Sequence, residues 1–168
     1  ASDMIIDDNS AENNGGGVHW SSAAYTWISP SHFNNVIISN NTVGSDGNVS
    51  YPKGGGLYAN YGIGIILTNC IIENNLSYHH GGGIYLMEYL PFHMNNSIIR
   101  GNESPTYSAG LLGLNHTTNI SLNDCEFTGN INTSTGGDGI FDPALYISAN
   151  SQDTFYEGIY EGFLSNIL

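Results

Sequence analysis

The chain has 168 residues and a formal net charge of −13, and Lys53 and Arg100 are its only fixed cations. This charge argues against nucleic acid and anionic membranes as partners, because both are bound through basic faces. An apolar content of 40% argues against disorder, and the length suits one domain with a sizeable core. No stretch resembles a signal peptide or a membrane span, and Ala1 lies almost inside a repeat, so we expect a segment of a longer protein.

A repeat marked by asparagine runs along the chain from its first residues. In each copy the positions three and five before the asparagine are mostly apolar, and the position two before it is polar. This alternation indicates a strand with one buried face. The position four before it is isoleucine in four copies and Glu126 in the last, and we expect it to face outward. The marking asparagines are Asn9, Asn41, Asn75, Asn102 and Asn130, at intervals of 32, 34, 27 and 28 residues.

Two further strands follow in each copy. A glycine-rich corner, such as residues 81–83, precedes an apolar segment that forms the second strand. A third apolar set lies eight to twelve residues before the next marking asparagine and forms the third strand. A polar pair separates this strand from the first strand of the next copy. The polar pairs include Asn35, Asn69 and Asn96. Each copy therefore contains three short strands and two corners marked by asparagine.

Such a unit can bury its apolar face only by stacking on its neighbours. Equivalent strands of successive copies would lie about 4.8 Å apart, and asparagines at one corner would bond to each other in a ladder. The sequence therefore predicts an all-β fold, a right-handed parallel β-helix of about five three-stranded rungs over residues 1–150. An antiparallel β-sandwich is the alternative, but it gives no reason for several columns to keep register.

Residues 151–168 depart from the repeat. After Asp153, pairs of apolar residues recur every four positions, close to a helical stripe. Gly158 and Gly162 oppose a helix by about 1 kcal/mol each. We expect this segment to be a cap over the last rung, which would otherwise be an unpaired sheet edge, or a contact with another subunit. No comparable cap precedes the first rung, so head-to-tail stacking is a further expectation.

Two motifs resemble the repeats of the polymorphic outer-membrane (Pmp-type) passengers of bacterial surface proteins. The sequence IENN at residues 72–75 is followed by GGGI at 81–84, and FTGN stands at 127–130. The resemblance covers about residues 4–147. It implies a β-helix that is secreted, displayed at the cell surface and used for adhesion.

Cys70 and Cys125 occupy the same column of the repeat, two rungs apart. Their Cα atoms should lie roughly 9–10 Å apart, which is beyond the reach of a disulfide. We therefore expect two reduced thiols that face inward, with Ser97 between them.

The sequence lacks the groups that polysaccharide lyases and hydrolases of this fold use. Neither Lys53 nor Arg100 has an acidic cluster beside it that would suit a calcium-dependent lyase. The pairs at residues 7–8 (Asp-Asp) and 80–81 (His-Gly) superficially match a polygalacturonase pattern, but they are 72 residues apart and the accompanying basic motif is missing. We predict no catalytic residue and no enzyme activity.

No metal site and no cofactor are expected. His79 and His80 would need a nearby acid such as Glu73 to bind a metal, and a solvated histidine pair is the simpler interpretation. Asp138 and Asp142 could share Ca²⁺, but a role in forming a turn is the better interpretation of Asp138. A module stabilised by Ca²⁺ is a third and weaker hypothesis, because an acidic surface attracts hard cations.

Tyr58 and Tyr85 are aligned on neighbouring rungs, with His19 in the same column. If these rings face outward, they form a strip suited to stacking on sugars. The alternative is an ordinary aromatic pair across rungs, worth about 0.5–1.5 kcal/mol. Among the N-x-S/T sequons, Asn48 and Asn132 lie in predicted loops and are the candidates for glycosylation.

These features favour a non-enzymatic, extracellular β-helix segment of a surface protein, with a structural, adhesive or filament-forming role. Its expected partner is a second copy, stacked end to end, or an extracellular polysaccharide or protein. A carbohydrate-binding or polysaccharide-processing module is the alternative function.

Overall fold

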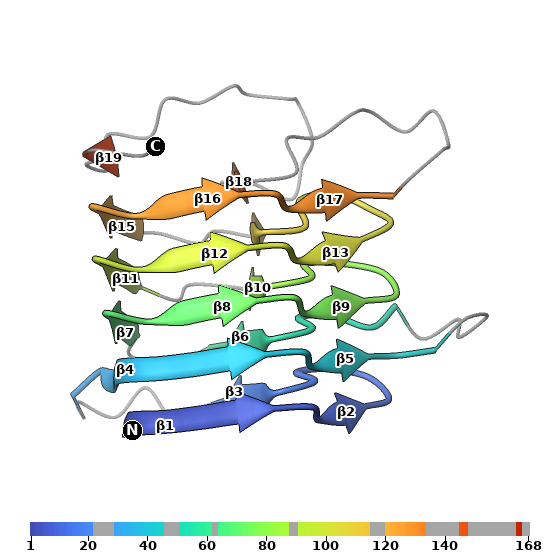
Figure 1. The fold of residues 1–168 in the computed structure, drawn as a ribbon, viewed down its shortest axis with the longest axis horizontal. Helices are drawn as coiled ribbons and strands as arrows, with labels where there is room; N and C mark the ends of the chain where they lie inside the picture. Colours follow the sequence, from blue (N-terminus) through green and yellow to red (C-terminus); the bar gives the residue numbers. More distant parts are fainter. Residues whose placement is uncertain are drawn as a thin grey trace.

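The computed structural model shows short parallel strands stacked into a solenoid (Figure 1). It describes residues 1–21, 29–45, 51–61, 64–87, 91–114, 120–133, 145–147 and 164–165. Every pairing between these strands is parallel. In Figure 1 the chain crosses the front from left to right, returns behind and rises towards the C-terminus, which is a right-handed coil. The expected right-handed parallel β-helix is therefore confirmed.

Four sets of equivalent strands build the solenoid. The front strands are β1 (Ser2–Asp7), β4 (Ser31–Ser39), β8 (Ile71–Glu73), β12 (Ile98–Arg100) and β16 (Glu126–Thr128). The side strands are β2 (Ser10–Ala11), β5 (Thr42–Val43), β9 (Leu76–Ser77), β13 (Glu103–Ser104) and β17 (Ile131–Asn132). The back strands are β3 (Val18–Ser21), β6 (Leu57–Asn60), β10 (Ile84–Met87), β14 (Leu111–Leu114) and β18 (Leu145–Ile147). The closing strands are β7 (Ile65–Thr68), β11 (Phe92–Asn95), β15 (Ile120–Asn123) and β19 (Leu164–Ser165).

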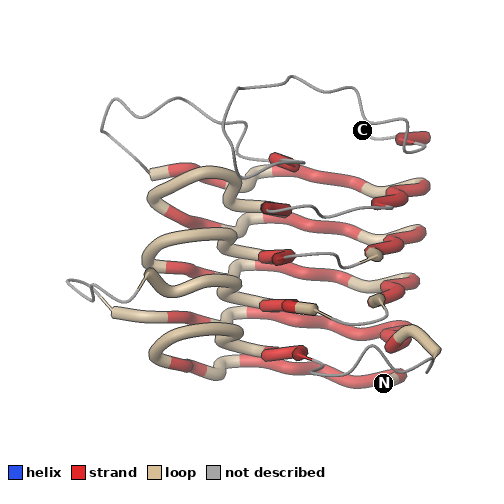
Figure 2. Tube along the Cα trace, turned by 180° about the vertical axis from the view of Figure 1, so that it is seen from behind, coloured by secondary structure: helices blue, strands red, loops and turns tan. Residues whose placement is uncertain are grey.

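These sets form three sheets. The side strands and the back strands each make a five-stranded sheet, which corresponds to four full turns from the first strand to the last. The front and closing strands share one sheet, because the first half of β4 pairs with β7 and its second half with β8. The two-residue side strands were not expected from the sequence, which indicated three strands per rung. Viewed from behind, the same rungs lie one above another (Figure 2).

The front strands alternate between buried and outward-facing side chains, as the repeat predicted. Ile38, Ile72 and Ile99, three residues before the marking asparagines, are buried. Their neighbours Ile37 and Ile71 face outward and are partly exposed. Inward residues of the front, closing and back strands join in one apolar core that runs the length of the stack.

The two cysteines lie in this core, and both are free thiols, as expected. Each thiol donates to a nearby carbonyl oxygen: Cys70 Sγ lies 3.3 Å from Thr68 O, and Cys125 Sγ lies 3.3 Å from Asn123 O. Ser97 occupies the same column between them, and its hydroxyl oxygen accepts the Cys70 N–H at 2.9 Å. Burial raises the pKa of both thiols, which makes them inert core residues.

Two columns of corners use a left-handed backbone. One column contains Asn35, Asn69 and Asn96, with φ between 52° and 53°, and it continues through Asp3 and Asp124 at the ends. The second column lies directly before each marking asparagine, and the sequence analysis did not single it out. Its members are Asp8, Asn40, Asn74, Gly101 and Gly129. Asparagine, aspartate and glycine are the residues that tolerate this conformation, which explains the composition of both columns.

Several expectations fall outside the described residues. Of the C-terminal segment 151–168, only the strand β19 is described, and the apolar stripe after Asp153 is not. Asn48, Asp138 and Asp142 also lie outside the described ranges. Within the residue ranges that the structure describes, no helix has the length and apolarity needed to cross a bilayer.

Candidate functional site

The marking asparagines form a continuous ladder at the corner between the front and side strands. Each side-chain Oδ1 accepts two hydrogen bonds from the asparagine of the preceding rung, one from its N–H and one from its Nδ2–H. Between Asn75 and Asn102 both distances are 3.0 Å. The same pair of bonds joins Asn9 to Asn41, Asn41 to Asn75, and Asn102 to Asn130. The ladder predicted from the sequence is therefore present through all five rungs.

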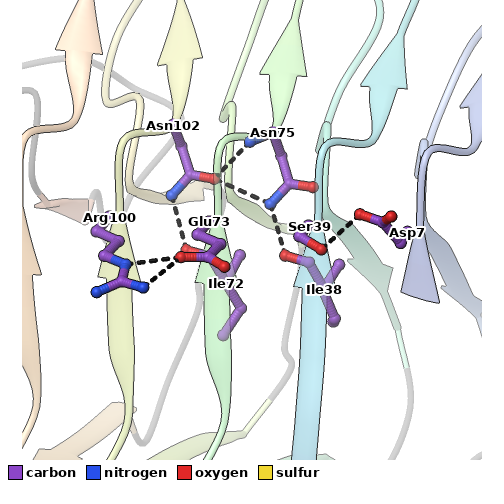
Figure 3. A network of polar contacts seen from close by, with 8 residues as sticks. All are labelled: Asp7, Ile38, Ser39, Ile72, Glu73, Asn75, Arg100 and Asn102. Atoms are coloured by element: carbon purple, nitrogen blue, oxygen red, sulfur yellow. Dashed lines mark hydrogen bonds and ion pairs between the residues drawn. The ribbon is translucent and has the colours of Figure 1, made fainter. Parts of the chain in front are cut away.

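Two more hydrogen bonds complete each step of the ladder. The remaining Nδ2–H donates to a front-strand carbonyl of the preceding rung, as from Asn102 to Ile72 O at 3.0 Å (Figure 3). The residue after each asparagine donates its N–H to the preceding ladder carbonyl, as from Glu103 to Asn75 O at 2.9 Å. Asn75 and Asn102 are buried with every side-chain hydrogen-bonding group paired. The ladder thus satisfies polar groups that would otherwise be costly to bury.

The exposed corner column of Asn35, Asn69 and Asn96 is a looser ladder. Asn96 Nδ2 donates to Asn69 Oδ1 at 3.0 Å, and Asn35 Nδ2 donates to Asp3 Oδ1 at 3.0 Å. Asn69 Nδ2 reaches Asn34 Oδ1 at 3.4 Å rather than its column neighbour. Because water competes for these exposed groups, this column contributes less to stability than the buried ladder.

The basic residues lie on different faces of the solenoid. Arg100 forms an ion pair with Glu73 across neighbouring front strands, with Nη2 and Oε2 2.6 Å apart (Figure 3). Lys53 lies in the connection before β6. Asp7 accepts hydrogen bonds from Ser39 and Asn40 at the end of the front sheet, and these bonds lower its pKa. In the described ranges, no three His, Cys, Asp or Glu side chains gather in a way that could hold a metal ion.

His19, Tyr58 and Tyr85 align on β3, β6 and β10 in the expected register. The two tyrosine rings stack with centroids 5.7 Å apart, and His19 meets Tyr58 edge to face at 4.9 Å. Both tyrosines are nevertheless covered, with 5% and 2% of their surface exposed, and only His19 is open to solvent. The rings have the contacts of a cross-rung aromatic pair. A role of these residues in binding sugars stays a prediction.

Tyr85 is covered by side chains that the sequence analysis did not connect with it. The His80 ring lies 6.2 Å from Tyr85 and 4.9 Å from Tyr107, and Lys53 Nζ lies 5.7 Å from the centre of the Tyr85 ring. These side chains come from connections between side and back strands, and Lys53 and His80 are bridge partners on neighbouring rungs. The sequence could have placed Lys53 and His80 in one column of the repeat, because each of them directly precedes a glycine corner. We call Lys53, His79, His80, Tyr85 and Tyr107 the aromatic–histidine cluster.

Thr106 determines the tautomer of His80. Its hydroxyl donates to the carbonyl oxygen of His79, so it can only accept from the ring of His80. The distance from His80 Nδ1 to Thr106 Oγ1 is 2.6 Å, which places the ring proton on Nδ1. Burial, together with the nearby His79 and Lys53, lowers the pKa of His80 to about 3. His80 is therefore neutral at physiological pH.

We expect this buried histidine to make stability depend on pH. Its folded pKa lies below the ordinary value of 6.5, so the unfolded chain takes up a proton first as the pH falls. The part of the free energy of unfolding that depends on neutral His80 is fully present above pH 6.5 and is lost towards pH 3, with about 3 kcal/mol gone by pH 4.5. Urea unfolding at pH 7 and pH 4.5 measures this loss. The control is His80→Asn, which keeps a donor for Thr106 but does not titrate. An equal loss in both proteins would show that His80 is not responsible.

The glycosylation candidate Asn132 lies in the side strand β17 rather than in a loop. Its Nδ2 donates to the carbonyl oxygen of Tyr107 at 2.6 Å, and the side chain is partly buried. A glycan on this nitrogen would have to break that bond. Nothing in the described residues tests whether Asn132 is modified.

Residues 69–86 match the family of the Chlamydia polymorphic membrane protein repeat. Comparison with curated proteins and with solved structures finds no match. The parallel rungs and the unbroken asparagine ladder define the chain as a parallel β-helix repeat protein. The residues matched to the polymorphic membrane protein repeat make up its third rung, from the corner at Asn69 through β8 and β9 into β10.

Proposed function

We propose that this protein is a surface-displayed, non-enzymatic β-helix segment that serves as a rigid structural and adhesive element outside the cell. The match of residues 69–86 to a polymorphic membrane protein repeat carries the proposal. The residues of that repeat act in the architecture: Asn75 belongs to the ladder, and Ile72 and Ile84 belong to the core. Such a repeat builds length and lateral surface, which suits display and contact more than chemistry.

Surface display has a direct test. Antibodies raised against the purified chain should label intact cells of its source without permeabilisation. Antibodies against a cytoplasmic protein of the same cells serve as the control, and they should label only opened cells. Labelling by both antibodies only after permeabilisation would contradict surface display.

Carbohydrate is the second candidate partner, favoured by an exposed tyrosine beside the aromatic–histidine cluster. Tyr51 is 61% exposed and meets His79 of the aromatic–histidine cluster edge to face at 4.6 Å. Aromatic rings that are open to solvent suit stacking on sugars. If the protein binds polysaccharide, Tyr51→Ala should remove its retention on immobilised polysaccharides without changing the unfolding temperature. Equal retention of Tyr51→Ala and the unsubstituted protein would contradict a role for this ring.

A further inference from the structure

Lys53 carries a positive charge that no described carboxylate neutralises. The other fixed cation, Arg100, forms an ion pair with Glu73, whereas within the described ranges no carboxylate forms an ion pair with Lys53. The Lys53 ammonium group lies instead 5.7 Å from the centre of the Tyr85 ring, and the side chain is partly exposed. In a chain with a net charge of −13, this group can pair with an anion that comes from outside.

The two histidines beside Lys53 add no charge of their own. Burial lowers the pKa of His79, and the nearby Lys53 lowers it further. His80, which is more deeply buried, has a pKa of about 3. Both rings are therefore neutral at physiological pH, and Lys53 is the charged group of the aromatic–histidine cluster.

Tyr51 presents an open aromatic ring at a conformational cost. Its φ is 52°, in the left-handed region that tyrosine rarely adopts, and it directly precedes Pro52. The side chain is 61% exposed, so burial of the ring does not offset this strain. Its ring meets His79, which Lys53 also approaches closely enough to influence its pKa. Strained residues cluster at functional sites, which makes this ring a candidate binding surface.

Pro52 fixes the backbone between Tyr51 and Lys53. Pro52 is buried, and its carbonyl oxygen accepts hydrogen bonds from Ser77 Oγ at 3.1 Å and from the His80 N–H at 3.0 Å. The backbone N–H and carbonyl oxygen of Lys53 both bond to the preceding rung. The chain that carries the two side chains is therefore held before a ligand arrives, which lowers the entropic cost of binding.

Tyr78 adds a second exposed ring on the neighbouring rung. It is 39% exposed, and it follows the side strand β9, which pairs with β5 (Figure 1). A Cβ at Gly44 would lie 2.4 Å from Pro52 Cγ and 3.3 Å from Tyr78 Cβ. The lack of a side chain at Gly44 thus lets the connections that carry Tyr51 and Tyr78 come together.

We propose that Tyr51 and Lys53 form a binding site for an acidic sugar, a pyranose ring that bears a carboxylate. The C–H face of the sugar stacks on the open ring of Tyr51, and the carboxylate pairs with the Lys53 ammonium group. Tyr78 offers an apolar surface to the next sugar of the chain. This inference rests on carbohydrate as a proposed partner and adds the charge that the sugar must carry.

The net charge of the chain limits which acidic sugars suit this site. A net charge of −13 repels polyanions, and the single charge of Lys53 can neutralise one carboxylate. A densely sulfated polysaccharide would therefore meet repulsion outside the site. The site suits an oligosaccharide in which neutral sugars flank one uronic or sialic acid residue.

Binding of the full chain to an oligosaccharide array tests the role of Lys53. The array contains oligosaccharides with one uronic or sialic acid residue and, for each, the counterpart whose carboxylate has been reduced to an alcohol. The unsubstituted protein should bind at least one acidic member about tenfold more tightly than its counterpart, and Lys53→Met should remove this preference. Arg100→Met is the control, because it removes the other fixed cation from a different face and should keep the preference.

Two substitutions of Tyr51 separate binding from stability. Tyr51→Asn should remove binding to both members of each pair. It should also raise the unfolding temperature by about 1–3 °C, because asparagine tolerates the left-handed conformation. Tyr51→Ala is the matched variant: it should remove binding equally without this gain, because alanine tolerates a positive φ no better than tyrosine does.

Other outcomes would overturn the proposal. Equal binding of acidic and reduced members, or a preference that survives Lys53→Met, would exclude the acidic-sugar site, while loss of binding in Tyr51→Ala would still support carbohydrate as a partner. A chain that binds no member would overturn both, and labelling of intact cells tests surface display separately. Binding that persists in Tyr51→Asn would also exclude the site. If Lys53→Met does not fold, Lys53→Gln replaces it.

Discussion

Replacing Asn102 with aspartate should lower the free energy of unfolding by about 3 kcal/mol or more. The substitution keeps the shape of the side chain but removes the two Nδ2–H donors that serve Ile72 O and Asn130 Oδ1. A carboxylate oxygen would then face two other oxygen atoms in a buried site, one of which is the Ile72 carbonyl oxygen seen in Figure 3. Urea unfolding of the purified variant at pH 7 measures the loss.

The matched control is the same chemical change at the exposed corner. Asn96→Asp should lower the free energy of unfolding by no more than about 0.5 kcal/mol. The corner column of Asn96 already contains aspartate, at Asp3 and Asp124, with the same backbone conformation. The hydrogen bond that its side chain donates to Asn69 Oδ1 is exposed to solvent. Similar losses for Asn102→Asp and Asn96→Asp would contradict the view that burial of the ladder is what makes it important.

Gly82→Ala should also lower the free energy of unfolding by about 3 kcal/mol. A Cβ at this glycine would lie 2.3 Å from the carbonyl oxygen of Glu103 in the next rung. The obstacle is backbone of the stack, so relief requires the two rungs to move apart and weakens the hydrogen bonds between them. The thermal unfolding midpoint should fall clearly, which differential scanning calorimetry measures.

Gly129→Asn is the control for this substitution. Gly129 has a φ of 61°, and the nearest atom to a Cβ there is 4.0 Å away. Asparagine already occupies the equivalent positions at Asn40 and Asn74. We expect Gly129→Asn to change the free energy of unfolding by no more than about 0.5 kcal/mol, because asparagine tolerates the left-handed conformation. A large loss for Gly129→Asn, or a small one for Gly82→Ala, would show that rung spacing does not set the need for glycine.

The buried ladder could be predicted because its signal is repeated. One asparagine alone predicts nothing, but five at similar intervals, each after the same alternation of apolar and polar residues, require stacking to bury their shared face. Stacking then dictates the direct bonds from Asn75 to Asn102 and along the rest of the column. The reduced state of Cys70 and Cys125 followed from the same columns, because two rungs of separation exceed a disulfide's reach.

The surroundings of the outward-facing side chains could not be predicted in this way. Tyr58 and Tyr85 share a column, and the sequence left open whether their rings face water. The connection before β6 is longer than those before β10 and β14, and all three differ in composition, so no repeat describes how they fold back over the back sheet. That folding brings His80 and Tyr107 to Tyr85 and removes the ring from solvent.

The sequence by itself determined the rungs, their register and the buried ladder of this protein, because these depend on regular spacing that every copy repeats. Only the tertiary structure decided which outward groups are covered and that His80 is neutral. These properties depend on contacts between connections that differ from rung to rung, and the spacing of the repeat does not contain those contacts.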